Sequence, residues 1–403
     1  MTAEPAERVP VTIITGYLGT GKTTLLNRLL QDDLFAHSVV VVNEFGEIGL
    51  DHLLIATPTE NTVVLEGGCM CCKLRGELVD TLADLHADAQ AGKIKPFDRV
   101  VVETTGLADP VPILQTIVSD PRLSRVYGLD RIVTLIDGQQ GGAHLLAHPE
   151  SAKQVAISDC LVVSKVDLIT VGRKRRLIAQ LREINPDAVV FTSSNGATDV
   201  GRVFAARPLD RREQLDAALQ WLNSAAYANG HSTPADGERD HAVPDGRNSA
   251  HVHEREHPHA DAYPRPRTID SFSFLVDGEV RADGLRLWIG MLTALKSRNI
   301  LRLKALLNVE GRPVVIQMVQ AVVYEPFTLE HWPDAERRSR IVVIGKGLVR
   351  ADIEGTFSLL RFGDDSPTGA AGMTAGTIDP ASYQRFLKAS NLLVRAAGGG
   401  RDG

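Results

Sequence analysis

Residues 16–24 read Gly-Tyr-Leu-Gly-Thr-Gly-Lys-Thr-Thr, and this stretch decides the fold class of the chain. It matches the P-loop pattern G-x-x-x-x-G-K-[ST] at every fixed position, from Gly16 to Thr23. The apolar run Val9–Thr15 precedes it and predicts a strand, and residues 24–30 follow with helical spacing. A strand, a glycine-rich turn and a helix in this order indicate a phosphate-binding loop rather than an ordinary turn.

The residue types of this loop explain its chemistry. Glycines let backbone N–H groups approach phosphate oxygens, and the helix N-terminus adds the positive end of its dipole. We expect Lys22 to reach the β- and γ-phosphates and the Thr23 hydroxyl to ligate Mg²⁺. The other nucleotide contacts predicted from this stretch are Gly16, Gly19, Thr20, Gly21 and Thr24.

Composition limits the class of protein. The chain has 403 residues, which at about 150 residues per domain predicts two or three domains. Its 43% hydrophobic and 23% charged residues are ordinary for a globular protein, and a net charge of −6 argues against nucleic-acid binding. No apolar run is long enough to cross a membrane, and residues 1–10 lack the apolar segment of an export signal. We therefore expect a cytoplasmic protein without membrane or nucleic-acid partners.

Short β-rich runs alternate with helical patterns from residue 9 to about residue 224. Several runs, such as Val39–Val42, are apolar without alternation, which is typical of strands buried on both faces of a parallel sheet. We predict an α/β P-loop NTPase domain over residues 1–225, with a doubly wound, mainly parallel sheet and ligands at the carboxyl ends of its strands. The predicted strands are Val11–Thr15, Val39–Asn43, Thr62–Leu65, Arg99–Glu103, Arg131–Ile136, Leu161–Ser164 and Ala188–Thr192.

Composition changes abruptly after this domain. Residues 226–268 are rich in Gly, Pro, Asp, Arg and His, and they lack the large aliphatic residues needed for a core, so we predict a flexible linker. A smaller α+β domain is predicted over residues 269–362, followed by a polar, Gly-rich tail over residues 363–403. The patterns behind these predictions are strands at Phe272–Val276, Val314–Val323 and Ile341–Ile344, a helical stripe from Leu285 to Leu295, and a late helix at Pro380–Ala396.

Two segments after the P-loop resemble the switch regions of a GTPase. Residues 43–51 follow the second strand, and among their acids Glu44 is a candidate ligand for Mg²⁺ or for a transferable metal. The strand that ends at Glu103 supplies an acid suited to the metal shell, so Lys22 and Glu103 are the catalytic candidates. Gly106 is placed for its N–H to meet the γ-phosphate, so loss of that phosphate would release the loop that follows.

Residues 164–167, Ser-Lys-Val-Asp, resemble the guanine-reading pattern N-K-x-D. In that pattern the carboxylate, here Asp167, pairs with the N1–H and N2–H₂ groups of guanine, and Lys165 belongs to the same loop. Ser164 stands where the pattern has Asn, which weakens the motif. Its place after the P-loop favours GTP, while strict selection against ATP stays open.

Cys69, Cys71 and Cys72 follow two glycines between the predicted switch segments. Thiolates bind Zn²⁺ strongly, but three of them supply at most three of the four ligands that tetrahedral zinc prefers. An incomplete cluster suits a metal that must leave again; a redox dithiol and a buried cluster are the alternatives. Its position suggests that nucleotide state changes metal affinity, with a coupling of about 1–3 kcal/mol. Cys160 stands alone in an apolar run and is expected to be a buried hydrophobic residue.

The predicted linker contains half of the twelve histidines of the chain. Neutral imidazole suits Zn²⁺, Co²⁺ or Ni²⁺, so the segment could collect metal weakly, and a solvated spacer is the alternative. The histidines are His231, His241, His251, His253, His257 and His259.

The P-loop together with Asn-Glu-Phe-Gly at 43–46, Gly-Gly-Cys-Met-Cys-Cys at 67–72 and Glu-Thr-Thr-Gly-Leu-Ala-Asp-Pro at 103–110 closely resembles the CobW-type GTPases. These are P-loop metallochaperones related to the nickel chaperones of urease and hydrogenase maturation. The resemblance extends to a C-terminal domain and implies a Mg²⁺-dependent GTPase. It also implies that the thiolate cluster binds Zn²⁺ or Co²⁺ and delivers it to a client metalloprotein. The C-terminal stretches that carry it are Arg302-Leu303-Lys304, Gln317–Gln320, His331-Trp332-Pro333 and Ile341–Gly345.

The function expected from these observations is a GTPase that binds zinc at the CxCC cluster and transfers it under nucleotide control. No residue stands out as an arginine finger or a water-orienting glutamine, so we expect slow intrinsic hydrolysis. The alternatives are a cobalt chaperone in cobalamin synthesis, a small-molecule kinase, and a zinc-storage protein with a vestigial P-loop. The client, the fourth metal ligand and a homodimeric state stay open.

Overall fold

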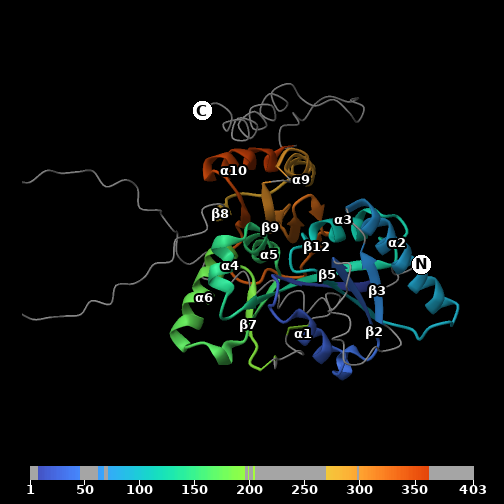
Figure 1. The fold of residues 1–403 in the computed structure, drawn as a ribbon. Coiled ribbons are helices and arrows are strands. Elements are labelled where there is room, and N and C mark those ends of the chain that lie inside the picture. Colours follow the sequence, from blue (N-terminus) through green and yellow to red (C-terminus); the bar gives the residue numbers. More distant parts are fainter. Residues whose placement is uncertain are drawn as a thin grey trace, which may run out of the picture.

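A computed structural model describes residues 8–45, 62–67, 71–195, 198, 203–204, 269–296 and 299–362 of the chain. These residues form two sheets, each with its own helices (Figure 1). The first sheet is parallel and the second is antiparallel. None of the described helices combines the length and the hydropathy that a membrane crossing requires.

The parallel sheet has seven strands in the order β3-β2-β4-β1-β5-β6-β7. Its strands are β1 (Val9–Gly16), β2 (Ser38–Phe45), β3 (Thr62–Gly67), β4 (Arg99–Thr104), β5 (Tyr127–Asp137), β6 (Cys160–Ser164) and β7 (Val189–Thr192). The helices between them are α1 (Lys22–Leu29), α2 (Cys71–Gln90), α3 (Val111–Ser119), α4 (Gly141–Ala147), α5 (Pro149–Ile157) and α6 (Val171–Ile184). All seven predicted strands and the predicted parallel pairing are confirmed. The sequence patterns did not predict α3, α4 and α5.

Alternate residues of the same strands face opposite sides of this sheet. Val39 and Val41 pack in the core under α2, α3, α5 and α6, whereas Val40 and Val42 pack with α1. Both faces are therefore covered, which explains the continuous apolar runs. Cys160 is buried on the α1 side, as its apolar neighbours predicted, and burial raises the pKa of its thiol to about 12.

The position of β1 at the centre of the sheet places the P-loop. From β1 the chain first builds β2, β3 and β4 on one side, and then β5, β6 and β7 on the other. The strand order therefore changes direction beside β1, and the loop after β1 opens where open α/β sheets bind ligands.

The second sheet has six strands and is antiparallel, in the order β11-β10-β9-β13-β8 with β12 paired to β10. Its elements are β8 (Ile269–Val276), α9 (Ala282–Lys296), β9 (Ile300–Val309), β10 (Arg312–Val319), β11 (Val322–Val323), β12 (Phe327–Thr328), β13 (Ser339–Lys346) and α10 (Arg350–Thr356). The single strand predicted at Val314–Val323 is wrong in detail, because a turn with Gln320 at a φ of 50° folds it into β10 and β11. The sequence patterns did not predict β9, although it is the longest strand here.

The two faces of the antiparallel sheet have different partners. One face packs under α9 and α10 around the fully buried Trp288, whose indole N–H donates to Thr356. The other face contributes Leu301, Val342 and Ile344 to the core beneath α5 and α6 of the first sheet. The molecule is therefore layered, with the second sheet lying between α9 and α10 on one side and the helices of the P-loop sheet on the other (Figure 1).

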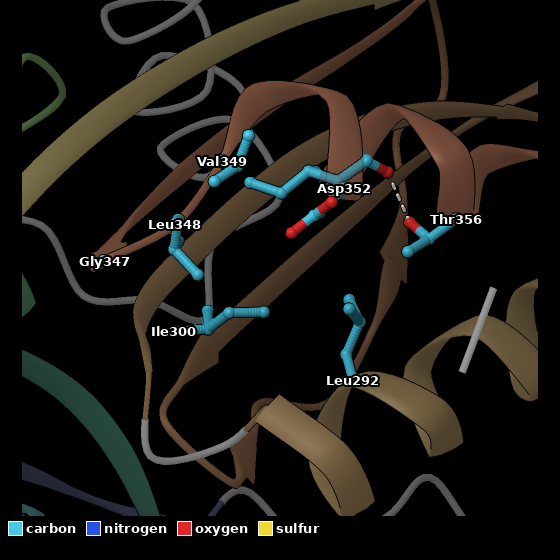
Figure 2. Close-up of a pocket in the computed structure, with 8 residues that line it drawn as sticks. Leu292, Ile300, Gly347, Leu348, Val349, Asp352 and Thr356 are labelled. Atoms are coloured by element: carbon cyan, nitrogen blue, oxygen red, sulfur yellow. Dashed lines mark hydrogen bonds between the residues drawn. The ribbon is translucent and has the colours of Figure 1, made fainter. Parts of the chain in front are cut away.

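A small pocket lies between α9, α10 and the start of β9 (Figure 2). Its lining is mostly aliphatic, with Leu292, Ile300 and Leu348 on its walls and Asp352 among them. It belongs to the antiparallel sheet and contains none of the residues predicted to bind nucleotide or metal.

Candidate nucleotide site

The P-loop joins β1 to α1 through three glycines with positive φ. The φ angles are 143° at Gly16, 72° at Gly19 and 93° at Gly21, a region that side chains other than glycine rarely adopt. A Cβ at Gly16 would also meet the Leu135 carbonyl oxygen of β5 at 2.5 Å. The glycines of the motif are therefore needed both for the turn and for close packing against the neighbouring strand.

Lys22 is the first residue of α1, and its side chain folds back over the loop. Its Nζ donates hydrogen bonds to the carbonyl oxygens of Gly16 (3.0 Å) and Tyr17 (3.3 Å). Gly21 caps the helix, and no acidic residue lies in the first turn. The loop therefore offers an ammonium group and the N–H groups of a helix N-terminus to an anion. Thr24 follows in the first turn and is exposed.

Thr23 and Glu103 come together from α1 and β4. The Thr23 hydroxyl donates to Glu103 Oε1 over 3.4 Å, and Glu103 is buried at the carboxyl end of its strand. Hydroxyl and carboxylate oxygens are the hard donors that Mg²⁺ prefers, and they meet beside the N-terminus of α1. The two residues fit a magnesium ion, so they would hold it here.

Gly106 lies against the P-loop. A Cβ on it would come within 2.6 Å of the Leu18 backbone nitrogen, so only glycine allows this approach. The buried Gly106 is followed by the exposed Leu107, which is 56% accessible. The structure thus places the loop after β4 in contact with the predicted phosphate site.

Ser164 connects β6 to the P-loop. Its hydroxyl lies 2.8 Å from the carbonyl oxygen of Thr20 and 3.2 Å from that of Ile136, as a donor to both. The Ser164 hydroxyl therefore connects the predicted base-binding loop to the phosphate-binding loop. This connection exists although the residue is Ser and not the Asn of the usual pattern.

Lys165 adopts a left-handed conformation, with a φ of 54°, that turns its side chain over the P-loop. Its Nζ donates to the Gly19 carbonyl at 2.8 Å and forms an ion pair with Asp137 at 2.6 Å. Burial alone would raise the pKa of Asp137, but the bonds from Lys165, Gln140 and Gln139 bring it below its ordinary value. Asp137 stays ionised and fixes the lysine above the loop.

Asp167 is exposed at the rim of the same site. One carboxylate oxygen accepts a hydrogen bond from the backbone N–H of Asn195, at 2.8 Å. Within the described part of the chain, no donor is bonded to the second oxygen of this carboxylate. The arrangement can accept N–H donors from a base that enters between the loops after β6 and β7.

The strand that precedes the thiol-bearing segment ends at the same edge of the sheet. β3 runs parallel to β2 with Glu66 beside Glu44 and Gly67 beside Phe45, and α2 begins at Cys71 and continues through Cys72. Cys69 lies outside the described residues, as do the predicted linker histidines, and nothing is described of the side chains of Cys71, Cys72 or Glu44. Within the described part of the chain, no group of three or more His, Cys, Asp or Glu residues is arranged to hold a metal.

Several residues of this site were not predicted from the sequence. Asp137 ends the apolar run of β5 as Glu103 ends that of β4, so an acid after a buried strand was the signal available for it. Tyr17 stacks on His148, with ring centroids 4.5 Å apart, at the junction of α4 and α5. No sequence pattern indicates this contact, because its two members lie far apart in the chain.

A glycine loop between a central parallel strand and a helix, with Lys22, Thr23 and Glu103 around it, defines a P-loop nucleotide-binding protein. The comparisons then give the family. The chain belongs to the CobW/HypB/UreG family, whose nucleotide-binding domain matches residues 10–192. The cobalamin synthesis protein cobW C-terminal domain matches residues 269–360. The resemblance drawn from the motifs is thereby confirmed.

Two curated relatives match most of this chain. The zinc chaperone YjiA of Escherichia coli is 30% identical over 355 residues, which cover 88% of this chain and 99% of that protein. The zinc chaperone CobW of Pseudomonas aeruginosa is 27% identical over 380 residues, which cover 86% and 90% of the two chains. The crystal structure of Zn(II)-bound YjiA GTPase from E. coli aligns with a TM-score of 0.59 and 25% identity, over 88% of this chain and 99% of that one.

Proposed function

We propose that this protein is a GTP-hydrolysing metallochaperone. In this proposal it binds zinc at Cys69, Cys71 and Cys72 and transfers it to a client metalloprotein under the control of the bound nucleotide. The observation that carries the proposal is where the relevant strands and loops lie in the parallel sheet. The P-loop, the Gly106 loop and the strand that leads into the thiol-bearing segment all end at one edge of one sheet.

The nucleotide part of the proposal is supported by the loops around the P-loop. Lys22 would neutralise charge on the β- and γ-phosphates, and the backbone N–H groups of α1 would donate to them. Asp167 would accept from the guanine base while Lys165 covers the loop. Magnesium, held by Thr23 and Glu103, would neutralise the charge that develops on the phosphate oxygens.

Slow intrinsic hydrolysis is also part of the proposal. Phosphoryl transfer to water needs a group that orients the water or an arginine that stabilises the charge. Among the described residues, Gln154 is a glutamine beside the loop after β4. Its side-chain amide nitrogen, however, donates to the carbonyl oxygens of Gly106 and Ala108. It is therefore engaged with the loop, and a client or the metal would complete the site.

The zinc part of the proposal is supported by the strand register and by the relatives. Phe45 and Gly67 pair at the ends of β2 and β3. In the sequence, Phe45 lies within the predicted switch segment, residues 43–51, and Gly67 precedes the thiol-bearing segment. Neighbouring strands lie about 5 Å apart and β2 separates β3 from β4, so the end of β3 lies roughly 10 Å from the end of β4. Both relatives above are named zinc chaperones.

The test measures GTP hydrolysis by the full chain with Mg²⁺ alone and with added Zn²⁺, Co²⁺ or Ni²⁺. We expect zinc to change the rate in the wild type and to have no effect in Cys71→Ala. Cys160→Ala, which removes a buried thiol from β6, is the matched control and should respond as the wild type does. A rate that no metal changes would favour zinc storage, and a response to cobalt alone would favour a cobalt chaperone.

A further inference from the structure

Two neighbouring side chains of α5 fasten the loop that follows β4. Gln154 Nε2 donates hydrogen bonds to the carbonyl oxygens of Gly106, at 3.2 Å, and of Ala108, at 3.3 Å. Lys153 forms an ion pair with Asp109, with 2.5 Å between Nζ and Oδ2. The loop is thus held by α5 on one side, while Gly106 packs against the P-loop backbone on the other.

The Gln154 hydrogen bonds are more deeply buried than the Lys153–Asp109 ion pair, and this makes them the stronger contact. Gln154 is 2% exposed, whereas the side chains of Lys153 and Asp109 are 20% and 40% exposed. An ion pair open to water contributes little, because solvent screens it and two long side chains must be ordered. Hydrogen bonds shielded from water keep more of their strength. Gln154 is therefore the residue that fixes the loop.

Helix α5 is itself held rigidly at its carboxyl end. Asn185 Nδ2 donates to the carbonyl oxygens of Val155 and Ser158, at 2.8 and 2.9 Å. The hydroxyls of Thr134 and Ser158 both donate to the backbone carbonyl of Gln154, at 3.2 and 2.5 Å. A side chain on a helix whose backbone is fixed by such bonds can hold a loop in one position.

The identity of residue 154 is not explained by packing alone. Gln154 Oε1 is buried and has no hydrogen-bond partner within the described part of the chain. An unused buried acceptor destabilises the folded state, so an apolar side chain of the same size would pack here at lower cost. A glutamine side chain, unlike an apolar one, donates the two hydrogen bonds to the loop.

We propose that Gln154 is a positioning residue for the γ-phosphate contact of Gly106. By holding the carbonyl oxygens of Gly106 and Ala108 on the α5 side, it keeps the loop oriented so that the Gly106 N–H faces the P-loop. Gln154 acts through the loop and not by touching the nucleotide. This inference rests on the proposed function, because it assumes that Gly106 meets the γ-phosphate.

The test compares affinities of the full chain for GDP and for a non-hydrolysable GTP analogue. Gln154→Met keeps the length of the side chain and removes both donor bonds. Affinity for the GTP analogue is expected to fall about tenfold, as for the loss of two ordinary hydrogen bonds, and affinity for GDP to stay within about twofold, since GDP lacks the phosphate concerned. Thermal unfolding of each variant establishes that it is folded.

Two control variants sharpen this comparison. Lys153→Met removes only the exposed ion pair and should change the ratio of the two affinities by less than about twofold. Glu150→Gln alters the exposed face of the same helix and should leave the ratio unchanged. If Gln154→Met fails to fold, Gln154→Asn replaces it, since its amide is one methylene too short to reach both carbonyls.

Gly106→Ala separates a failure of this inference from a failure of the proposed function. Its Cβ would push the loop off the Leu18 backbone, so the affinity ratio should shift in the same direction as in Gln154→Met. If Gly106→Ala leaves the ratio unchanged, the γ-phosphate contact is wrong and the role of Gln154 falls with it. If Gly106→Ala shifts the ratio and the Gln154 variant does not, only the positioning role is wrong. An equal loss of both affinities in Gln154→Met would also overturn it.

Discussion

The two ends of the parallel sheet contain charged side chains of very different kinds. At the carboxyl end, the buried Lys22 begins α1 and the exposed Asp167 lies in the short turn after β6, both at the predicted nucleotide site. At the amino ends of β6 and β7, Asp159 and Asp187 face β9 of the second sheet. The first group surrounds the predicted nucleotide site, whereas the second lies between the two sheets.

The pKa values of the buried group are shifted strongly from their ordinary values. Arg302 is 1% exposed, forms an ion pair with Asp159 and donates to the Ile157 carbonyl at the end of α5. Burial, followed by the charge of Arg302, lowers the pKa of Lys304 to about 8. Burial raises the pKa of Asp187. A perturbed pKa is often taken as a sign of a functional site, and this cluster shows that an interface between domains produces it as well.

The largest effect expected at the carboxyl end is that of Lys22→Ala. Affinity for GTP should fall by at least about 100-fold, because hydrogen bonds from a charged group to the phosphates are lost. The free energy of unfolding should change much less than the GTP affinity, since the Lys22 ammonium bonds to the Gly16 and Tyr17 carbonyl groups of its own loop. Nucleotide titration and chemical denaturation measure the two quantities, with the exposed Lys93→Ala as control. Full GTP affinity in Lys22→Ala would refute the P-loop assignment.

A smaller effect is expected at the buried end, in the pH dependence of stability. The pKa of Lys304 is about 8 in the folded protein and 10.5 as the ordinary value, so between these pH values the unfolded chain binds more protons. Stability contributed by this group therefore rises with pH in that window, by at most about 1.4 kcal/mol per pH unit. Below pH 8 both states are protonated and the contribution is constant.

Comparison with Lys304→Met isolates this contribution from the groups that face Lys304, namely Arg302, Asp159 and Asp187. The difference in free energy of unfolding between wild type and variant should move in favour of the wild type from pH 8 to pH 9.5. Urea denaturation at several pH values measures it. A difference that is independent of pH would mean that Lys304 does not titrate in this window.

The smallest effect concerns the bond that joins the two nucleotide loops. Ser164→Ala removes the hydroxyl that donates to the Thr20 carbonyl and should weaken GTP binding about fivefold, as for one buried hydrogen bond. Ser164→Asn supplies the amide of the usual pattern and should bind at least as well as Ser164→Ala. Equal binding by wild type and Ser164→Ala would show that this bond does not position the loop.

The sequence predicts the carboxyl end of the sheet well because its chemistry is local. The P-loop, the acid at Glu103 and residues 164–167 are short contiguous patterns that end or follow strands, and the parallel sheet then brings them to one edge. Each pattern can therefore be recognised from its own residues, and the order of the strands determines that the patterns lie close together.

The amino end of the sheet is not predicted for the opposite reason. Asp159, Asp187, Arg302 and Lys304 are isolated residues, and only tertiary packing brings them together. The same is true of Gln154, which reads as an ordinary helix residue until α5 is placed beside the Gly106 loop. β9 was missed because its polar residues face the other domain, so its pattern is neither purely apolar nor alternating toward water.

The most direct test of the account measures zinc affinity in two nucleotide states. The full chain, with Mg²⁺ present, competes with a chromophoric chelator for Zn²⁺ in the presence of GDP or of a non-hydrolysable GTP analogue. We predict zinc affinities that differ by at least about fivefold in the wild type, and no such difference in Cys71→Ala. Identical zinc affinities in the two nucleotide states of the wild type would contradict it.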